Sequence, residues 1–355
     1  MASYPSATKS FTTKVDGAGN TILAAYVNDL QDEVVAIENG LRTGLAHVLQ
    51  PTVAGAQDLG SPSLPWGNAY VTGLPMDIGL CEGRLTLTSG TAVTTADVTG
   101  AGTLYFTPFH GNRVALFDGS AWALYTFTEL SLVLTLTSGK PYDVFLYNNS
   151  GTLTLETLVW TNDTTRATAL ALQHGVYVKS GATTRRYLGT LYASGANTTE
   201  DSAAKMYLWN YYNRMPRHGR VADATASWAY TTATWRQANA AAANQVDLVV
   251  GVSDSPVWVT VWAAALNATQ VYLNVAVAED SATVPTITAG GLTGGLAGGF
   301  IVPITAVLVK VPAVGRHYYA WLEASQAAGT TNWYGTNTTL GGNSQTSAIT
   351  AQWWH

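Results

Sequence analysis

Alternation of apolar residues with threonine, beginning near residue 83, is the pattern that most limits the folds open to this chain. Short runs place leucine, phenylalanine or valine at every second position, and turn signals such as Asp118-Gly119 and Ser138-Gly139 separate them. A period of two with frequent turns predicts short antiparallel strands that bury one face. We therefore expect a mainly β protein built of sandwich or jelly-roll-like sections.

The β region divides into two sections near residue 202. Residues 83–201 carry the clean alternation, whereas residues 202–355 begin with a dense aromatic stretch and continue with more apolar strands. The runs from Val257 to Ala265 and from Ile301 to Val311 are nearly continuous in apolar character. Such runs predict strands buried on both faces, and in an all-β protein they can mean a sheet covered by another subunit.

Residues 21–45 predict an α-helix of different character. Apolar residues step by four and three along one stripe, which is the spacing of a coiled-coil seam. The seam residues are Leu23, Val27, Leu30, Val34, Ile37 and Leu41. A helix this short frays without a partner face. It either docks on its own chain or forms a parallel bundle of identical helices. The strict spacing favours the bundle but does not distinguish a two-helix from a three-helix bundle.

Residues 1–20 form a leader before this helix, and residues 46–82 form a neck after it. The neck is rich in proline and glycine and has neither a helical nor a strand period, so we expect a turn-rich connection. Trp66 lies in its middle. An indole ring is costly to expose, so we expect Trp66 to pack against a neighbouring segment, either of its own chain or of another subunit.

Composition excludes several classes of protein. Charged residues make up 11% of the chain, against roughly 25% in ordinary domains. With 17 Lys and Arg residues and a net charge of -5, the chain is not expected to bind nucleic acid. A single cysteine cannot form a disulfide within the chain. No apolar run approaches the ~20 residues of a membrane span, so we expect neither a signal peptide nor a membrane segment.

Two segments carry a family resemblance. FTTKVDGAGNTILAAYVNDLQDEVVAIENGL, residues 11–41, resembles the N-terminal segment of many bacteriophage virion proteins, and DLGSPSLPWGNAYVTG, residues 58–73, is similar to the Trp-Gly motif of phage tail-fibre proteins. The region from about Arg84 to Gln237 also resembles phage structural proteins. The resemblance implies a tail fibre, spike or head fibre, commonly a homotrimer attached to other virion proteins by its N-terminus.

The sequence offers no clear catalytic site. It has no Gly-x-Ser-x-Gly elbow, and its six histidines are dispersed without metal-ligand spacing. We therefore expect no enzyme activity, no metal and no cofactor. The enzymatic alternative is a polysaccharide depolymerase, because glycoside cleavage needs only two carboxylates that converge in space.

Binding is better supported than catalysis. Aromatic rings beside neutral amides suit sugar recognition, and the C-terminal part offers candidates for receptor contact. They are Trp333, Tyr334, Asn337, Trp353 and Trp354. Packing in a subunit interface is the alternative for these aromatics. Arg214, Arg217 and Arg220 form a basic cluster in the sequence. It predicts contact with an acidic ligand, and the alternatives are a solvated loop or an ion-pair site between subunits.

These expectations combine into one hypothesis. The protein is a virion appendage, assembled in the host cytoplasm, that attaches by its N-terminus and contacts a host surface glycan through residues 202–355. The alternatives are a capsid decoration or head-fibre protein and, third, a depolymerase.

Overall fold

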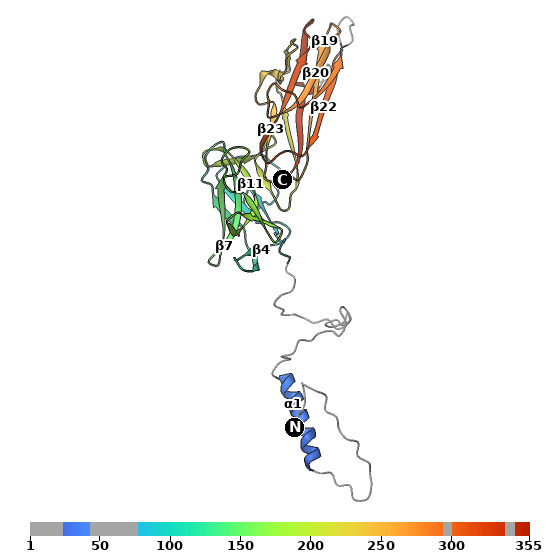
Figure 1. The fold of residues 1–355 in the computed structure, drawn as a ribbon. Coiled ribbons are helices and arrows are strands. Elements are labelled where there is room, and N and C mark those ends of the chain that lie inside the picture. The colour runs from blue at the N-terminus through green and yellow to red at the C-terminus, as the bar shows by residue number, and fades with distance from the viewer. Residues whose placement is uncertain (1–23, 43–76, 294–299, 338–344) are drawn as a thin grey trace, which may run out of the picture. The chain divides into compact units, whose positions relative to one another are not determined.

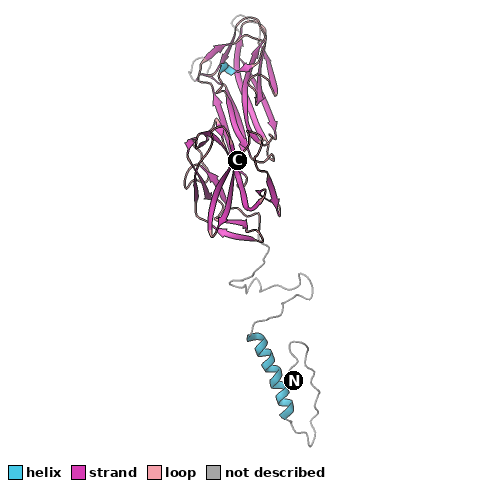
Figure 2. Cartoon of the chain, turned by 60° about the vertical axis from the view of Figure 1, so that its left-hand side comes forward, coloured by secondary structure: helices cyan, strands magenta, loops and turns pink. Residues whose placement is uncertain are grey.

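The computed structural model describes residues 24–42, 77–293, 300–337 and 345–355. They belong to two compact units, within residues 1–74 and 75–355. The first contains helix α1 (Ala24–Arg42), and the second contains strands β1 to β27 with one turn of 3-10 helix, η1 (Ala238–Ala240). Strands dominate the second unit (Figures 1 and 2). The prediction of a mainly β protein with an N-terminal helix is confirmed.

Helix α1 occupies the middle of the segment predicted to be helical. Four residues of its seam, Val27, Leu30, Val34 and Ile37, are between 42% and 55% exposed. Leu23 and the Leu41 side chain lie outside the described residues, as do the leader and Trp66. The coiled-coil bundle stays a prediction. The helices among the described residues include none long and apolar enough to cross a membrane.

The section from residue 83 to 201 consists of antiparallel strands around one hydrophobic core. Its strands are β1 (Gly83–Thr86), β2 (Val98–Ala101), β3 (Thr103–Pro108), β4 (Arg113–Phe117), β5 (Trp122–Thr126), β6 (Leu130–Val133), β7 (Pro141–Asn149), β8 (Thr152–Val159), β9 (Leu170–Gln173), β10 (Val176–Lys179), β11 (Ala182–Gly195) and β12 (Thr198–Asp201). Strands β1, β3 and β6 form one sheet, β4 and β5 form a hairpin, and β11 pairs with β7, β10 and β12. The alternating residues Leu85, Leu104 and Phe106 fill this core.

The remaining strands follow residue 202. They are β13 (Lys205–Met206), β14 (Leu208–Asn210), β15 (Pro216–Ala222), β16 (Ser227–Ala229), β17 (Arg236–Gln237), β18 (Gln245–Val250), β19 (Val257–Asn267), β20 (Tyr272–Glu279), β21 (Ile287–Leu292), β22 (Val302–Lys310), β23 (Gly315–Ser325), β24 (Thr331–Tyr334), β25 (Thr336–Asn337), β26 (Gln345–Thr346) and β27 (Ala348–Trp354). Strand β13 pairs antiparallel with β12 of the preceding section and in parallel with β18, so one sheet continues across the boundary between the two sections.

Two sheets of the second section enclose the larger core. Strands β21, β20, β23 and β18 neighbour one another in one sheet, and β22, β19, β27 and β15 do so in the other. Their facing side chains form a single cluster, in which Val275 and Trp321 come from the first sheet and Val259 and Ile349 from the second. All four side chains are fully buried. The alternate side chains of these strands point away from this core, onto the outer face of each sheet.

The prediction that both apolar runs are buried on both faces is wrong for most of their length, and only Ala263, Ala264 and Ala265, at the end of the first run, are buried at successive positions. In β22 the side chains of Ile304, Ala306 and Leu308 enter the core, while Val307 and Val309 are exposed. Strand β19 alternates in the same way along its first half. Strand β22 and the first half of β19 therefore have one core face and one outer face, because only one sheet packs against them.

Candidate functional site

The outer face of the sheet formed by β22, β19, β27 and β15 carries the candidate site. Pairing places Trp258 of β19 opposite Gln352 of β27, and Gln352 opposite His218 of β15. The next outward row joins Thr260, Thr350 and Arg220 in the same order. Outward residues of paired strands lie side by side on one face, so six side chains from three distant segments form one surface.

A groove of about 360 Å³ lies on this surface, and we call it the Trp258 groove. Its lining residues are His218, Gly219, Arg220, Trp258, Thr260, Thr350, Ala351 and Gln352. The polar groups of the lining are hydroxyls, an amide, an imidazole and a guanidinium, and it contains no carboxylate. The groove thus combines an aromatic ring with several neutral groups able to form hydrogen bonds.

Trp258 is the large apolar side chain of the groove, and it is 55% exposed. Its neighbours Val257 and Val259 are fully buried in the core, so the alternation of β19 directs the Trp258 side chain outward. Pairing with Val309 of β22 places another exposed apolar residue beside it. The ring is therefore held on a central strand, paired on both sides, while its surface stays accessible.

Strand β15 supplies the basic edge of the groove. Glycine at position 219 lets this strand approach the core closely, because a Cβ there would lie 2.8 Å from Val246 and 3.0 Å from the carbonyl oxygen of Ala203. The amide of Arg220 donates a hydrogen bond of 2.8 Å to the same carbonyl oxygen. These contacts fix the backbone of Arg220, whereas its side chain is exposed on the opposite face.

The five predicted receptor contacts do not form one surface. Trp333 and Trp353 are 0% exposed and belong to the core, so the expectation that they touch a receptor is corrected. Tyr334 is half-buried, and the side chain of Asn337 lies outside the described residues. Only Trp354 is well exposed, at 44%. It lies on β27 two residues beyond Gln352 and does not line the Trp258 groove.

The three arginines of the predicted basic cluster have different environments. Arg214 forms a two-pronged ion pair with Asp254, at 2.6 and 2.8 Å, and lies over the Trp209 ring. Arg217 donates to the carbonyl oxygen of Thr94 at 2.7 Å and lies 3.6 Å from the Asp201 carboxylate. Arg220 alone of the three reaches the Trp258 groove. The structure therefore separates residues that the sequence grouped together.

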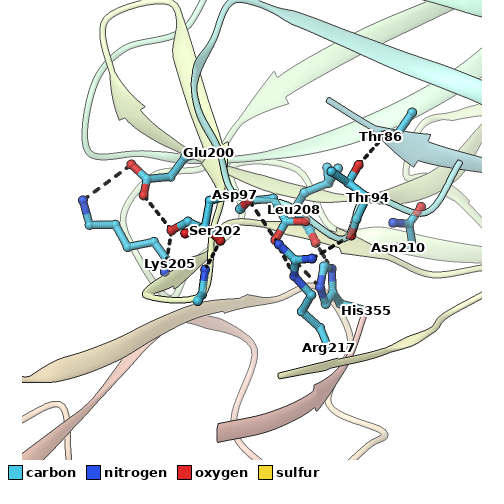
Figure 3. A network of polar contacts seen from close by, with 12 residues as sticks. Thr86, Thr94, Asp97, Glu200, Ser202, Lys205, Leu208, Asn210, Arg217 and His355 are labelled. Atoms are coloured by element: carbon cyan, nitrogen blue, oxygen red, sulfur yellow. Dashed lines mark hydrogen bonds and ion pairs between the residues drawn. The ribbon is translucent and has the colours of Figure 1, made fainter. Parts of the chain in front are cut away.

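Arg217 lines a second, more enclosed pocket of about 240 Å³. Arg84, Asp201 and His355 also line it, and His218 lines both this pocket and the groove. Figure 3 shows Arg217 and His355 close together within a network of polar contacts. The ring Nδ1 of His355 contacts the carbonyl oxygen of Leu208, which only accepts, so Nδ1 carries the proton. Burial and the nearby Arg84 and Arg217 lower the pKa of His355, although Asp201 opposes them.

Three polar atoms of this enclosed pocket have no hydrogen-bond partner among the described residues. They are Oδ1 of Asp201, Nε of Arg217 and Nε2 of His355. Nε2 of His355 lies 3.8 Å from Oδ1 of Asp201. When His355 is neutral with Nδ1 protonated, its Nε2 and Oδ1 of Asp201 are both hydrogen-bond acceptors.

Buried charges elsewhere are engaged in internal contacts. Burial raises the pKa of Glu323 to about 7, although Trp228 and Arg236 bind the carboxylate and oppose the shift. Asp143 accepts hydrogen bonds from Arg166 and Thr190. Within the described residues, no group of three or more His, Cys, Asp or Glu side chains is arranged to hold a metal ion.

Sequence reasoning missed Trp258, the most exposed tryptophan side chain of this face. It lies in the run PVWVTVWAAAL, whose nearly continuous apolar character predicts a strand buried on both faces. The available signal was the phase within that run, where valine at positions 257, 259 and 261 alternates with Trp258, Thr260 and Trp262. Valine on one face and a mixture of tryptophan and threonine on the other is typical of a strand with one exposed face.

Comparison with known proteins assigns no family. No family profile matches this sequence, and no curated protein matches it. Solved structures that resemble the chain include wild-type BuGH86 in complex with neoagarooctaose, with 8% identity, a TM-score of 0.22, and coverage of 73% of this chain and 33% of that chain. A Cry1Da tryptic core variant from Bacillus thuringiensis has 7% identity, a TM-score of 0.19 and coverage of 66% and 48%.

The insecticidal delta-endotoxin Cry8Ea1 from Bacillus thuringiensis is similar at 7% identity and a TM-score of 0.20, with coverage of 76% of this chain and 51% of that chain. The chain thus spans between a third and about half of the length of these proteins. At these TM-scores the similarities support no statement about the function of this chain.

Proposed function

We propose that the protein is a non-enzymatic appendage of a bacteriophage virion that binds a host surface glycan through the Trp258 groove. The observation that carries the glycan-binding part is the exposed Trp258 ring beside Thr260, Thr350 and Gln352. The apolar C–H face of a sugar packs on an indole ring, while its hydroxyls exchange hydrogen bonds with side-chain hydroxyls and amides. The groove offers both kinds of contact within one lining.

The virion part of the proposal rests on the resemblance of residues 11–41 and 58–73 to phage appendage proteins. The exposed seam of α1 supports self-association, because a stripe of Val27, Leu30, Val34 and Ile37 gains stability when another helix covers it. We propose a trimer, the state that the resemblance implies. Several identical grooves on one oligomer raise the effective concentration at a glycan-coated surface, so each groove can be weak.

Binding to an array of bacterial capsular and lipopolysaccharide glycans tests the groove. We expect the oligomeric protein to bind a subset of these glycans and Trp258→Ala to weaken binding at least tenfold, equivalent to about 1.4 kcal/mol. Trp354→Ala is the matched control, since it removes an exposed tryptophan from the same face outside the groove. Equal losses in both variants would contradict a specific role for Trp258.

Two further measurements separate this proposal from its alternatives. Labelled antibody that decorates the capsid of virions and leaves the tail unlabelled would favour a capsid decoration or head-fibre protein. Release of soluble reducing ends from a bound polysaccharide, abolished by one carboxylate substitution, would instead establish a depolymerase.

A further inference from the structure

Arg220 stands out among the cationic side chains of the described residues. Every other described Arg or Lys side chain has a hydrogen-bond or ion-pair partner in the fold, such as Glu156 for Arg185 and Glu279 for Lys310. Arg220 makes neither an ion pair nor a side-chain hydrogen bond with any described residue. The chain has 22 acidic against 17 basic residues, so carboxylates are not scarce. A cation left without one in such a chain is available for an external anion.

The position of Arg220 relative to Trp258 suits a single ligand. The two residues lie on strands β15 and β19, with β27 between them, which separates the strands by about 10 Å. Along the strands they are offset by two residues, or about 7 Å. Both side chains line one groove and extend over the same face. A saccharide packed on the Trp258 ring therefore brings a neighbouring acidic substituent within reach of the long arginine side chain.

We infer that the Trp258 groove takes an anionic glycan, whose uronic acid carboxylate is bound by the guanidinium of Arg220 while Trp258 packs against a sugar ring. This inference rests on the proposed function and names its ligand class. A guanidinium binds a carboxylate through two parallel N–H donors, which gives both affinity and orientation. The exposed imidazole of His218 lies in the same row as Trp258 and lines the same groove. The lining has no carboxylate to repel it.

A second copy of this chain is the competing occupant of the face. Its apolar contacts would be with the exposed Val307 and Val309 on β22. The groove itself lies on the other side of Trp258, over β27 and β15, where hydroxyl, amide and basic side chains predominate. That composition matches a hydrated anionic sugar better than the apolar centre of a subunit interface.

The test uses the full chain and three uronic acid polymers, polygalacturonate, alginate and hyaluronate, each beside its carboxyl-reduced neutral counterpart. Biolayer interferometry at two salt concentrations gives the apparent Kd. We expect at least one carboxylated polymer to bind tenfold or more tightly than its neutral counterpart. Arg220→Gln should remove that preference, and Arg220→Lys, which keeps the charge without the planar fork, should retain part of it. Higher salt should reduce the difference in apparent Kd between each carboxylated polymer and its neutral counterpart.

Lys205→Gln is the matched control for charge. It removes one positive charge from an exposed side chain outside the groove, and we expect it to leave the carboxylate preference unchanged within twofold. Circular dichroism spectra and melting temperatures of all variants check that the fold is kept.

The outcomes separate this inference from the proposed function. Trp258→Ala should weaken binding to the charged and the neutral polymer alike. If Trp258→Ala abolishes binding while Arg220→Gln changes nothing, glycan binding stands and the anionic ligand is overturned. Failure of the wild type to prefer any carboxylated polymer overturns the inference too, and Trp258-dependent binding to the glycan array then remains the measure of the proposed function. An Arg220→Gln variant that changes the oligomer mass instead of polymer binding would assign the face to a second copy.

Discussion

Trp353 and Trp354 are adjacent in the sequence but face opposite sides of β27. The Trp353 side chain is fully buried in the core between the two sheets, whereas Trp354 is 44% exposed. Their backbones pair with Arg217 and Pro216 of β15. Two identical side chains one residue apart therefore have different roles, because successive residues of a strand point to opposite faces.

This relationship predicts very different effects on stability. Trp353→Ala should lower the free energy of unfolding by about 3 to 5 kcal/mol, because it leaves a large cavity in the core. Trp354→Ala should change it by less than about 1 kcal/mol. Urea unfolding followed by circular dichroism measures both. Trp353→Phe should cost less than Trp353→Ala, since the indole Nε1 donates no hydrogen bond to any described residue. Similar losses in the two alanine variants would contradict the burial of Trp353.

Arg84 connects distant parts of the β unit, and its replacement should be costly. Its guanidinium donates to the carbonyl oxygens of Ala92 and His355 at 2.7 Å each, and to that of Asn213 at 3.3 Å. Burial lowers the pKa of Arg84 to about 10, with Asp201 opposing the shift, so the group is still charged at neutral pH. We expect Arg84→Met to lower the free energy of unfolding by about 3 kcal/mol.

Lys205→Gln serves as the control for Arg84→Met, because an exposed ion pair contributes less than about 1 kcal/mol. Urea titrations of both variants and the wild type supply the comparison. An Arg84→Met protein as stable as the wild type would mean that the desolvation of the buried guanidinium cancels its hydrogen bonds.

His317 should make stability depend on pH in the neutral range. Its Nδ1 lies 2.7 Å from Oδ2 of Asp280, and its Nε2 lies 3.0 Å from the carbonyl oxygen of Ala313. Both partners accept, so the ring binds them best when both nitrogens carry protons. Burial lowers the pKa of His317, but the hydrogen bond and charge of Asp280 outweigh burial and raise it overall.

Because the folded pKa of His317 lies above the unfolded value of about 6.5, the imidazolium stabilises the fold fully below that pH. The contribution is lost as the pH rises through the folded pKa. We expect the melting temperature of the wild type to fall over this range relative to that of His317→Gln. Parallel melting profiles for the two proteins from pH 6 to 9 would show that His317 does not gain its proton on folding.

The seam of α1 gives a prediction about assembly. Leu30→Lys places a charge in the centre of the apolar stripe, where a bundle of identical helices would bury it. We expect this variant to dissociate into 37.5 kDa chains, as measured by mass photometry. Gln31→Lys, at an exposed position beside the stripe, should keep the oligomer. A wild-type protein that is already a stable monomer would contradict the predicted bundle.

Local patterns were sufficient to predict the elements themselves. The spacing of Val27, Leu30 and Val34 is that of one helix face, and the alternation around Leu85 and Leu104 is that of half-buried strands. Both patterns arise between residues that are close in the sequence, so they need no knowledge of the rest of the fold. The core positions of residues 83–201 follow from the same alternation.

Local patterns did not predict which face of each strand of the second section is exposed. An alternating pattern shows that neighbouring residues lie on opposite faces of a strand. The sheet that packs against the strand decides which of the two faces is buried. Trp258 faces outward because its neighbour Val259 lies in the core between the two sheets, to which Val275 of the opposite sheet also belongs, while Trp353 faces inward at the same core. Those contacts join residues far apart in the chain, and no local pattern specifies them.

The separation of the basic cluster has the same origin. Arg217 and Arg220 are three residues apart on β15, an odd number, so their side chains lie on opposite faces. The partners of Arg217 are the Asp201 carboxylate and the carbonyl oxygen of Thr94, which lie more than a hundred residues apart in the sequence. The sequence could therefore identify the strands and the helix, whereas the pairing of β15, β27 and β19 decided which side chains meet in the groove, because hydrogen bonding between distant strands sets their common face.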